Sequence, residues 1–454
     1  MSSVLHRNLR ESLPVAVRGA GIYLFDRAGK KYLDASGGAA VSSLGHGHPG
    51  VAAAVHRQMQ ALEFAHTSFF SSQPAEELAA RLIALAPQGF GRGRVAFFSG
   101  GSEAVEGAIK LARQFHVEAG QSQRTRFIAR RMSYHGNTLG ALALSGHPGR
   151  RAVYEPMLMP AAFVSPCHPY RYQGTNESAD AYADRLAGEL DQEIEVLGPE
   201  TVAAFIVEPV VGATLGAVTP VGRYLARVRE ICNRHGVLLI ADEIMCGMGR
   251  CGDFFVSEQE AIVPDLITVA KGLGGGYQPI AGVLVQERVA EAIARGSGQL
   301  AHGHTYMAHP VACAAALAVI DYIRGNDLLA NVKRQGQLLE QRLRDAFGSQ
   351  RFVGDIRGRG LLWALELVRD RQTKEPFPQE CQLAGHIKSR ALEYGLVCYP
   401  SSGTVDGRLG DHVLLAPPFT IDEAQIDELI AKLSSTLGVE VNAASRSGRW
   451  DERR

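Results

Sequence analysis

Two uninterrupted apolar runs stand out in the middle of the chain, at residues 237–241 and 266–270. Both are short and rich in aliphatic and β-branched residues, which is the pattern of parallel strands that are buried on both faces. Each run is followed by one charged residue, Asp242 in the first case and Lys271 in the second. Because ligands of open α/β sheets bind beyond the carboxyl ends of the strands, we expect these two side chains to face one ligand.

Units of strand, polar loop and helix lie on the N-terminal side of these runs as well. Apolar runs at 95–98 and 127–129, and a third that ends at Glu208, are each followed by a polar loop. The spacing from Glu208 to Asp242 and then to Lys271 fits successive strand and helix pairs. The pattern therefore predicts an α/β protein with a mostly parallel sheet flanked by helices.

The ends of the chain have a different pattern from its middle. Short strand-like segments occupy residues 14–35, and amphipathic helices alternate with strands after residue 322. A chain of 454 residues is too long for one compact core. We expect residues 1–55 and 321–440 to form a smaller α/β domain, residues 56–320 to form a large ligand-binding domain, and residues 441–454 to be a mobile tail.

The amino-acid composition limits which binding partners and which cellular compartment we expect. The 47 basic residues balance the 47 acidic ones, which argues against a nucleic-acid or membrane-surface partner. The seven cysteines are scattered without CxxC pairs, so a reducing cytoplasm is expected, and neither a disulfide framework nor a zinc site is indicated. His46 and His48 lie in a glycine-rich turn that more often forms structure than binds metal, so no metal site is predicted.

An acid and an amine at neighbouring strand ends suit a heteroaromatic aldehyde as the ligand. The lysine can condense with the aldehyde, while the aspartate keeps the ring nitrogen protonated. Upstream, the turn Ser99–Ser102 joins a strand to a helix and directs backbone N–H groups at an anion such as a phosphate. The residues alone leave open a buried Asp242–Lys271 ion pair and an ordinary capped helix.

The motifs SGGSEAVEGAIKLAR, YHGNTLGAL, EPVVGATLG, LLIADEIMCGMGR, PDLITVAKGLGGG and HGHTYMAHPVACAAALA follow one another in this order. Together they resemble the class-III pyridoxal-phosphate-dependent aminotransferases of fold type I, over about residues 19–437. The resemblance implies pyridoxal 5′-phosphate as cofactor. It also implies a catalytic role for Lys271, which would hold the cofactor aldehyde and then move the proton during catalysis.

The resemblance carries cofactor contacts to individual positions. Asp242 resembles the partner of the ring nitrogen, and Glu208 resembles the residue that supports it. Tyr134 and Ile244 resemble the residues on either side of the ring, and Gly101–Ser102 resembles the phosphate cradle.

Another family position concerns the quaternary structure. Thr305 resembles the threonine that reaches the phosphate of the partner subunit's cofactor, which implies a homodimer with shared active sites, possibly assembled into a tetramer.

Departures from the family pattern bear on the substrate. Ala213 stands where relatives of ornithine and γ-aminobutyrate aminotransferases have a second Glu, and Leu414 stands where they have an Arg. Arg408 lies near the mobile Arg of amine:pyruvate enzymes and is predicted to bind the acceptor carboxylate; a solvated loop Arg is the alternative. Gly38 and Ala39 stand where some amine-type enzymes have bulky pocket walls.

These features predict a ping-pong transaminase that moves an amino group from an amine or ω-amino acid to a keto acid, with pyruvate as the expected acceptor. A glutamate-semialdehyde aminomutase-like or decarboxylating enzyme is the alternative within the same chemistry. A non-catalytic pyridoxal-phosphate-binding regulator is the alternative from a different class, and an intact Lys271 disfavours it.

Overall fold

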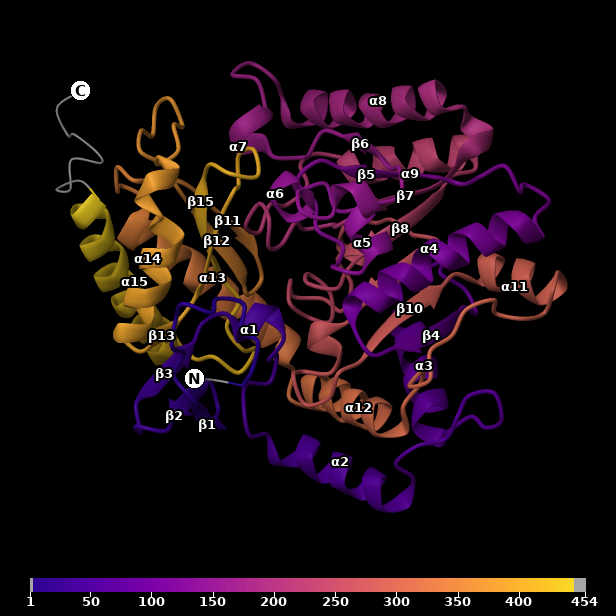
Figure 1. Ribbon diagram of the computed structural model, residues 1–454, viewed down its shortest axis with the longest axis horizontal. Helices are drawn as coiled ribbons and strands as arrows, with labels where there is room; N and C mark the ends of the chain where they lie inside the picture. The colour runs from indigo at the N-terminus through magenta and orange to yellow at the C-terminus, as the bar shows by residue number, and fades with distance from the viewer. Residues whose placement is uncertain (1–2, 445–454) are drawn as a thin grey trace.

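A seven-stranded sheet forms the centre of the computed structural model, which describes the backbone of residues 3–444 and the side chains through Glu440 (Figure 1). Its strand order is β4-β10-β9-β8-β7-β5-β6. All pairings are parallel except the two that β10 makes with its neighbours. The strands are β4 (Arg94–Phe98), β5 (Arg126–Arg130), β6 (Ala162–Val164), β7 (Val202–Val207), β8 (Leu238–Asp242), β9 (Leu266–Val269) and β10 (Ala281–Val285).

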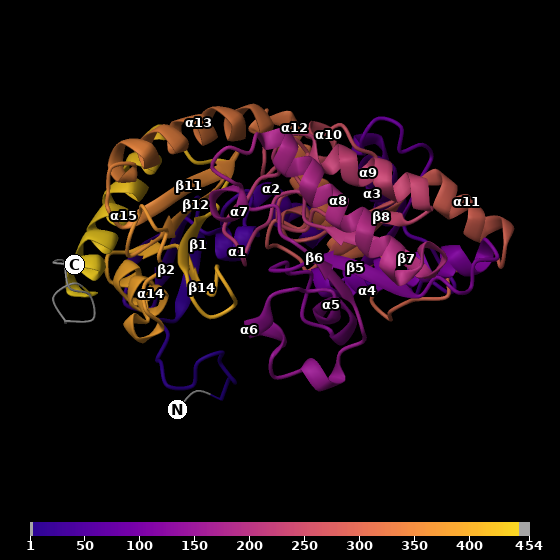
Figure 2. The ribbon, with the colours of Figure 1, turned by 90° about the horizontal axis from the view of Figure 1, so that it is seen from above.

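Both faces of this sheet are covered, which explains the uninterrupted apolar runs in the sequence. In β8, Leu238 and Ile240 pack with helices α4 (Gly101–Glu118) and α11 (Glu287–Arg295). Leu239 packs with α8 (Ala179–Leu197) and α9 (Tyr224–His235) on the opposite face. Figure 2 shows α8 and α9 together over one side of the sheet. Because neither face meets solvent, the strands need no polar alternation.

The helices of the large domain stand before, between and after its strands along the chain. They are α2 (Pro49–Ala61), α3 (Gln73–Leu85), α4 (Gly101–Glu118), α5 (Leu139–Ala143), α6 (Pro148–Arg151), α7 (Pro169–Tyr172), α8 (Ala179–Leu197), α9 (Tyr224–His235), α10 (Val256–Gln259), α11 (Glu287–Arg295) and α12 (Pro310–Gly325). Short 3-10 turns occupy Glu155–Met157, Pro199–Thr201 and Lys271–Leu273.

Both ends of the chain contribute to the smaller domain beside this sheet. A four-stranded sheet joins β1 (Ala16–Ala20), β2 (Tyr23–Asp26) and β3 (Lys31–Asp34) to β13 (Leu396–Val397), and β3 pairs with β13 in parallel. A second sheet has the order β11-β12-β15-β14, from β11 (Val353–Arg359), β12 (Leu362–Leu367), β14 (Tyr399–Ser402) and β15 (Asp411–Leu415). The helical elements of the smaller domain are α1 (Gly37–Ala40), α13 (Leu328–Phe347), α14 (Leu383–Glu393), α15 (Glu423–Ala444) and the 3-10 turn Gln379–Cys381.

The expected fold class is confirmed, and the structure adds two features that the pattern did not predict. β10 returns antiparallel to β9 because residues 270–280 contain a single 3-10 turn and no crossover helix. In addition, α15 extends to Ala444, so the first four residues of the expected mobile tail are helical, and residues 445–454 lie outside the described chain.

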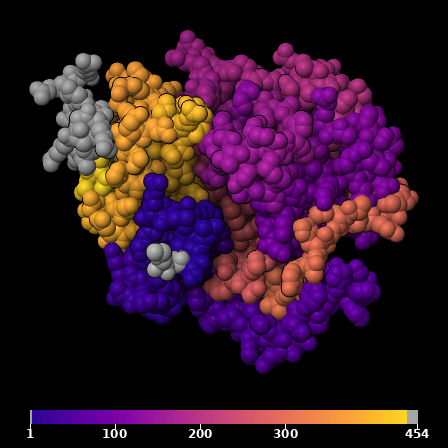
Figure 3. Space-filling model, in the orientation of Figure 1, coloured from indigo at the N-terminus to yellow at the C-terminus, as the bar shows by residue number. Residues whose placement is uncertain are grey.

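The two domains meet along a hollow on the face seen in Figure 3, between the orange C-terminal part and the magenta large domain. The seven cysteines are all buried. Within residues 3–444, no helix is both long enough and apolar enough to cross a membrane.

Candidate functional site

Adjacent strands bring Asp242 and Lys271 to the same edge of the sheet. Asp242 is the last residue of β8 and pairs with Thr268 of β9, and Lys271 follows two residues after the end of β9. Lys271 itself has a left-handed φ of 46°. A non-glycine residue is held in this conformation only where the surrounding structure enforces it, as at many functional sites. The predicted juxtaposition at the carboxyl ends of the strands is therefore present.

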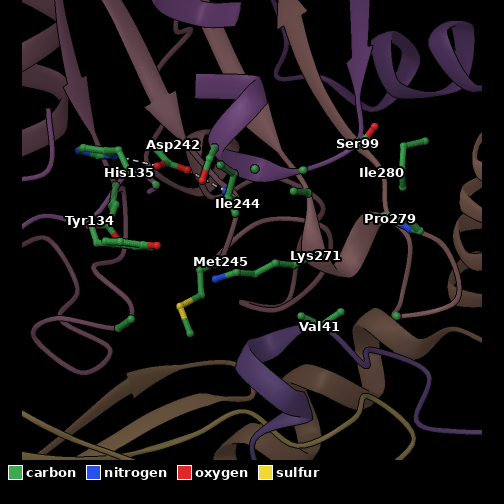
Figure 4. A pocket seen from close by; sticks show the side chains of 18 of the residues that line it. Val41, Ser99, Tyr134, His135, Asp242, Ile244, Met245, Lys271, Pro279 and Ile280 are labelled. Atoms are coloured by element: carbon green, nitrogen blue, oxygen red, sulfur yellow. Dashed lines mark hydrogen bonds and ion pairs between the residues drawn. The ribbon is translucent and has the colours of Figure 1, made fainter. Parts of the chain in front are cut away.

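A cavity of about 500 Å³ lies beyond these strand ends. Its charged lining consists of Asp242, Glu208 and Lys271, and the remainder is mainly apolar or glycine. Figure 4 shows the Lys271 side chain extending across the cavity towards Met245, with Asp242 and Ile244 on another wall. The volume is in the range of a small-molecule or cofactor site.

Asp242 is buried, and both of its carboxylate oxygens have hydrogen-bond partners. Its Oδ1 accepts from the backbone N–H of Ile244 at 3.1 Å and from the Thr268 hydroxyl at 3.2 Å, and its Oδ2 lies 2.7 Å from His135 Nδ1. Sequence reasoning missed His135. It follows Tyr134 in the loop after β5, and only the fold shows that this loop passes the end of β8.

Glu208 comes directly after β7 and supports the loop that carries Tyr134. Its carboxylate accepts the backbone N–H groups of Tyr134 and Gly212, each at 3.0 Å. Burial raises the pKa of Glu208, and the nearby Asp242 carboxylate raises it further. Glu208 therefore fixes the position of the Tyr134 ring, which lines the cavity.

The environment of Lys271 favours the neutral form of its amine. Burial lowers the pKa of Lys271, although the carboxylates Asp242 and Glu208 act in the opposite direction. A neutral lysine amine can attack a carbonyl carbon, and a protonated one cannot. The site therefore combines a nucleophilic amine with a buried carboxylate.

An anion cradle lies at another side of the same cavity, at the N-terminus of α4. No described side chain caps this helix, and Gly100, Gly101 and Ser102 all line the cavity. A Cβ at Gly101 would approach Ile244 to 3.1 Å, and a Cβ at Gly136 would meet the Ser102 hydroxyl at 2.7 Å. Glycine therefore keeps this cradle open around the helix N-terminus, where the helix dipole favours a phosphate.

This donor set fits pyridoxal phosphate. The helix N-terminus and Ser102 could hold the phosphate, Asp242 could hold the ring nitrogen, and Lys271 could hold the aldehyde. The apolar side chain of Ile244 and the ring of Tyr134 supply flat packing surfaces within the same cavity.

The structure does not bring every predicted residue to this cavity. Gly38 and Ala39 do not line it, and the same segment reaches it through Val41 instead. Thr305 is exposed on the loop before α12. Arg408 is exposed and lines a separate hollow of about 240 Å³ with Gln382 and other residues, so its role as a substrate contact stays a prediction.

The strand-end lysine and aspartate, the uncapped helix and the sheet order together define a fold-type-I pyridoxal-phosphate transferase. The family model for class-III aminotransferases matches residues 5–437. This chain therefore belongs to the class-III aminotransferase family, whose members depend on pyridoxal phosphate.

Known relatives agree with this assignment over nearly the whole chain. An uncharacterised aminotransferase of Schizosaccharomyces pombe is 44% identical over 425 residues, which cover 93% of this chain and 92% of the relative. The structure of an (S)-enantioselective omega-transaminase from Thermomicrobium roseum is 36% identical, with a TM-score of 0.90 and 96% of both chains covered. An omega-transaminase from Pseudomonas jessenii in complex with PMP is 34% identical, with a TM-score of 0.90 and coverage of 98% of this chain and 97% of that chain.

Proposed function

We propose that this aminotransferase transfers an amino group from an amine or ω-amino acid to a keto acid, with pyruvate as acceptor, by a ping-pong mechanism. The observation that carries the proposal is the apolar wall beside Lys271. Ala213 and Met245 line the cavity, and Leu414 is buried in the same apolar cluster as both of them. A wall of this kind favours an uncharged substituent on the donor. The likeness to solved structures named omega-transaminases supports the same proposal.

The chemistry divides between the cofactor and the chain. Pyridoxal phosphate supplies, when bound, an aldehyde that combines with amines and a ring that accepts electrons. Lys271 Nζ, whose pKa is lowered by burial, would move a proton from the amino-bearing carbon of the donor to the cofactor in the first half-reaction, and from the cofactor to the former carbonyl carbon of the keto acid in the second.

Asp242 would hold a proton on the ring nitrogen of the cofactor, and His135 fixes the Asp242 carboxylate in place. Glu208 holds the loop of Tyr134, whose aromatic ring would pack against the cofactor. The charged residue at or just after each strand end therefore has one role, and the sheet sets the distances among Glu208, Asp242 and Lys271.

The expected homodimer is also part of the proposal, since Thr305 would contact the cofactor of the partner subunit. Large aromatic side chains are exposed close to Thr305 in sequence or space. Tyr306 is 60% exposed and packs against Phe64 at a ring distance of 5.6 Å, and nearby Phe69 and Phe70 are 79% and 68% exposed. A second copy of the chain would bury this aromatic surface.

Light scattering and cofactor retention test the dimer. We expect the double variant Phe69→Ser, Phe70→Ser to dissociate and to lose cofactor more readily, while Val196→Ser, an exposed residue on α8, leaves both unchanged. A wild-type chain that is monomeric yet fully active would refute the shared active site.

Absorbance of the bound cofactor tests the reaction itself. An amine donor should change the visible spectrum of the holoenzyme, and pyruvate should restore it with formation of alanine. Lys271→Ala should bind cofactor but fail to complete this cycle. If product forms without any keto acid, an isomerising or decarboxylating reaction replaces the proposal, and an unchanged spectrum with every amine would exclude turnover.

A further inference from the structure

Besides Arg408, a second arginine, Arg150, lies near the site, and the proposed mechanism gives it no role. It belongs to α6, and its guanidinium carbon lies 4.5 Å from the centre of the Tyr134 ring. Tyr134 lines the cavity that holds Lys271. The Arg150 charge also acts at Lys271, where it adds to the effect of burial in lowering the pKa of the amine. Arg150 therefore contacts a residue that lines the cavity, and its charge is felt at Lys271.

Arg150 is half-buried, yet its guanidinium forms no ion pair with any carboxylate of the described residues. Its neighbour Arg151 differs in this respect. Arg151 donates to the backbone carbonyls of Leu142, Ala143 and Ser145 and pairs with Glu155. Arg151 thus has a structural role. In contrast, a half-buried arginine without a carboxylate partner in the chain has N–H donors available for the carboxylate of a ligand.

The charges of the cavity show why such a donor is needed. Asp242 and Glu208 would repel a carboxylate, and Lys271, the only cation lining the cavity among the described residues, is engaged by the carbonyl chemistry. A keto acid brings its carboxylate directly beside the reacting carbonyl. Its binding therefore requires a further cation close to Lys271.

Arg150 contacts Tyr134, which lines the cavity, whereas the exposed Arg408 lines the separate hollow beside α14. The loop that carries it nevertheless touches α6, since a Cβ at Gly149 would lie 2.5 Å from the carbonyl oxygen of Gly407. The two arginines thus lie on touching segments, and only Arg150 reaches Tyr134.

We propose that Arg150 binds the carboxylate of the keto acid acceptor at the Tyr134 side of the cavity. This inference rests on the proposed transaminase function. A guanidinium matches a carboxylate with two parallel hydrogen bonds, whereas an amine donor without a carboxylate makes no use of it. Arg150 is therefore a specificity-determining residue for the acceptor half-reaction.

Steady-state kinetics with matched acceptors tests the proposal. Acetaldehyde is pyruvate with the carboxylate replaced by hydrogen, so it needs no cation. For Arg150→Gln we expect the KM for pyruvate to rise about 10- to 100-fold, the range for one charge-assisted interaction, while the KM for acetaldehyde and for the amine donor stays unchanged. Arg150→Lys should recover part of the loss, because it keeps the positive charge but lacks the two parallel N–H donors of the guanidinium.

A binding measurement provides a readout independent of turnover. Titration calorimetry of the holoenzyme with propionate, an unreactive carboxylate, should detect binding to the wild type and much weaker binding to Arg150→Gln. Arg7→Gln serves as the control, since the exposed Arg7 is another cation whose charge acts on Tyr134, and it should bind propionate as the wild type does. Arg408→Ala tests the other candidate for this carboxylate, and it should retain propionate binding if Arg150 is the partner.

Several outcomes would overturn the proposal while the transaminase function stands. An equal loss with pyruvate and acetaldehyde, or a loss of cofactor from Arg150→Gln, would mean that Arg150 only positions Tyr134. A selective pyruvate defect in Arg408→Ala or Arg7→Gln, with Arg150→Gln unaffected, would transfer the role to that residue. In contrast, a wild type that forms no alanine from pyruvate would refute the proposed function itself.

Discussion

At the scale of single residues, the pair His135–Asp242 shows how one contact supports the site. His135 is buried, and its Nδ1 is the partner of the Asp242 carboxylate at 2.7 Å. We expect His135→Leu to lower the free energy of unfolding by about 1–3 kcal/mol, because it leaves a buried carboxylate oxygen without its donor.

The same substitution should weaken cofactor retention, since the carboxylate is no longer fixed. Denaturant titration and cofactor release by dialysis measure the two effects. His56→Leu, on the exposed face of α2, is the control and should change neither. If His135→Leu keeps both the stability and the cofactor of the wild type, His135 has no role in positioning Asp242.

A second single-residue prediction concerns pH. His412 in β15 is buried with Thr404 as its hydrogen-bond partner, and burial, together with the charge of Arg357, lowers the pKa of His412 to about 3. In the unfolded chain this histidine takes up a proton below about 6.5. Protonation therefore favours the unfolded state, and the protein should lose stability as the pH falls from about 6.5 towards 3.

Denaturation midpoints measured across this pH range test the assignment to His412. His412→Gln cannot take up a proton, so its stability should fall less steeply with decreasing pH than that of the wild type. Parallel curves for the two proteins would show that His412 is not one of the groups responsible.

At the scale of elements, the packing of α4 against β4 decides whether a glycine in the helix can be replaced by a larger residue. Gly107 in α4 is buried, and a Cβ there would lie 2.6 Å from Phe98 Cζ. Gly188 in α8 is exposed, and a Cβ there would meet nothing within 4 Å. Alanine is the better helix former at both positions.

We therefore expect the Gly→Ala substitution to change the free energy of unfolding in opposite directions at these two positions. Gly188→Ala should stabilise the protein by about 0.5–1 kcal/mol through helix propensity alone. Gly107→Ala should destabilise it by about 1–3 kcal/mol, because the added methyl group overpacks the contact with Phe98. Denaturant titration of both variants measures the difference, and stabilisation by both would mean that α4 can move away from β4 at little cost.

At the scale of the whole molecule, a buried ion cluster joins the two domains. Glu366 of β12 pairs with Arg357 of β11 in the small domain and with Arg171 of α7 in the large one, with contacts of 2.6 Å to each. Burial by itself would raise the pKa of Glu366, but Arg357, His168 and Arg171 together outweigh it and lower the pKa well below the usual range. This carboxylate contributes stability above its unfolded pKa, and the contribution is lost as the pH falls.

Removing the charge of Glu366 should weaken the contact between the domains. We expect Glu366→Gln to cost about 3–5 kcal/mol in the free energy of unfolding, because two largely buried arginines lose their carboxylate. Glu291→Gln breaks only an exposed pair with Arg295 and should cost less than about 0.5 kcal/mol. Equal effects of the two substitutions would show that the cluster does not hold the domains together.

The sequence by itself determined the parallel part of the sheet and the two residues at the carboxyl ends of its central strands. Asp242 and Lys271 could be predicted because a strand's periodicity and its end are local properties, and parallel strands bring their carboxyl ends to one edge. The motif resemblance then gave the family, since the motifs extend over most of the chain.

Only the tertiary structure decided which loop side chains reach the cavity. Gly38, Ala39 and Arg408 do not line it, whereas Val41 does and Arg150 lies against Tyr134. The conformation of a loop depends on the segments packed against it, and those segments are remote in the sequence. The position of each rim side chain is therefore set by packing between domains, which the local order of residues does not encode.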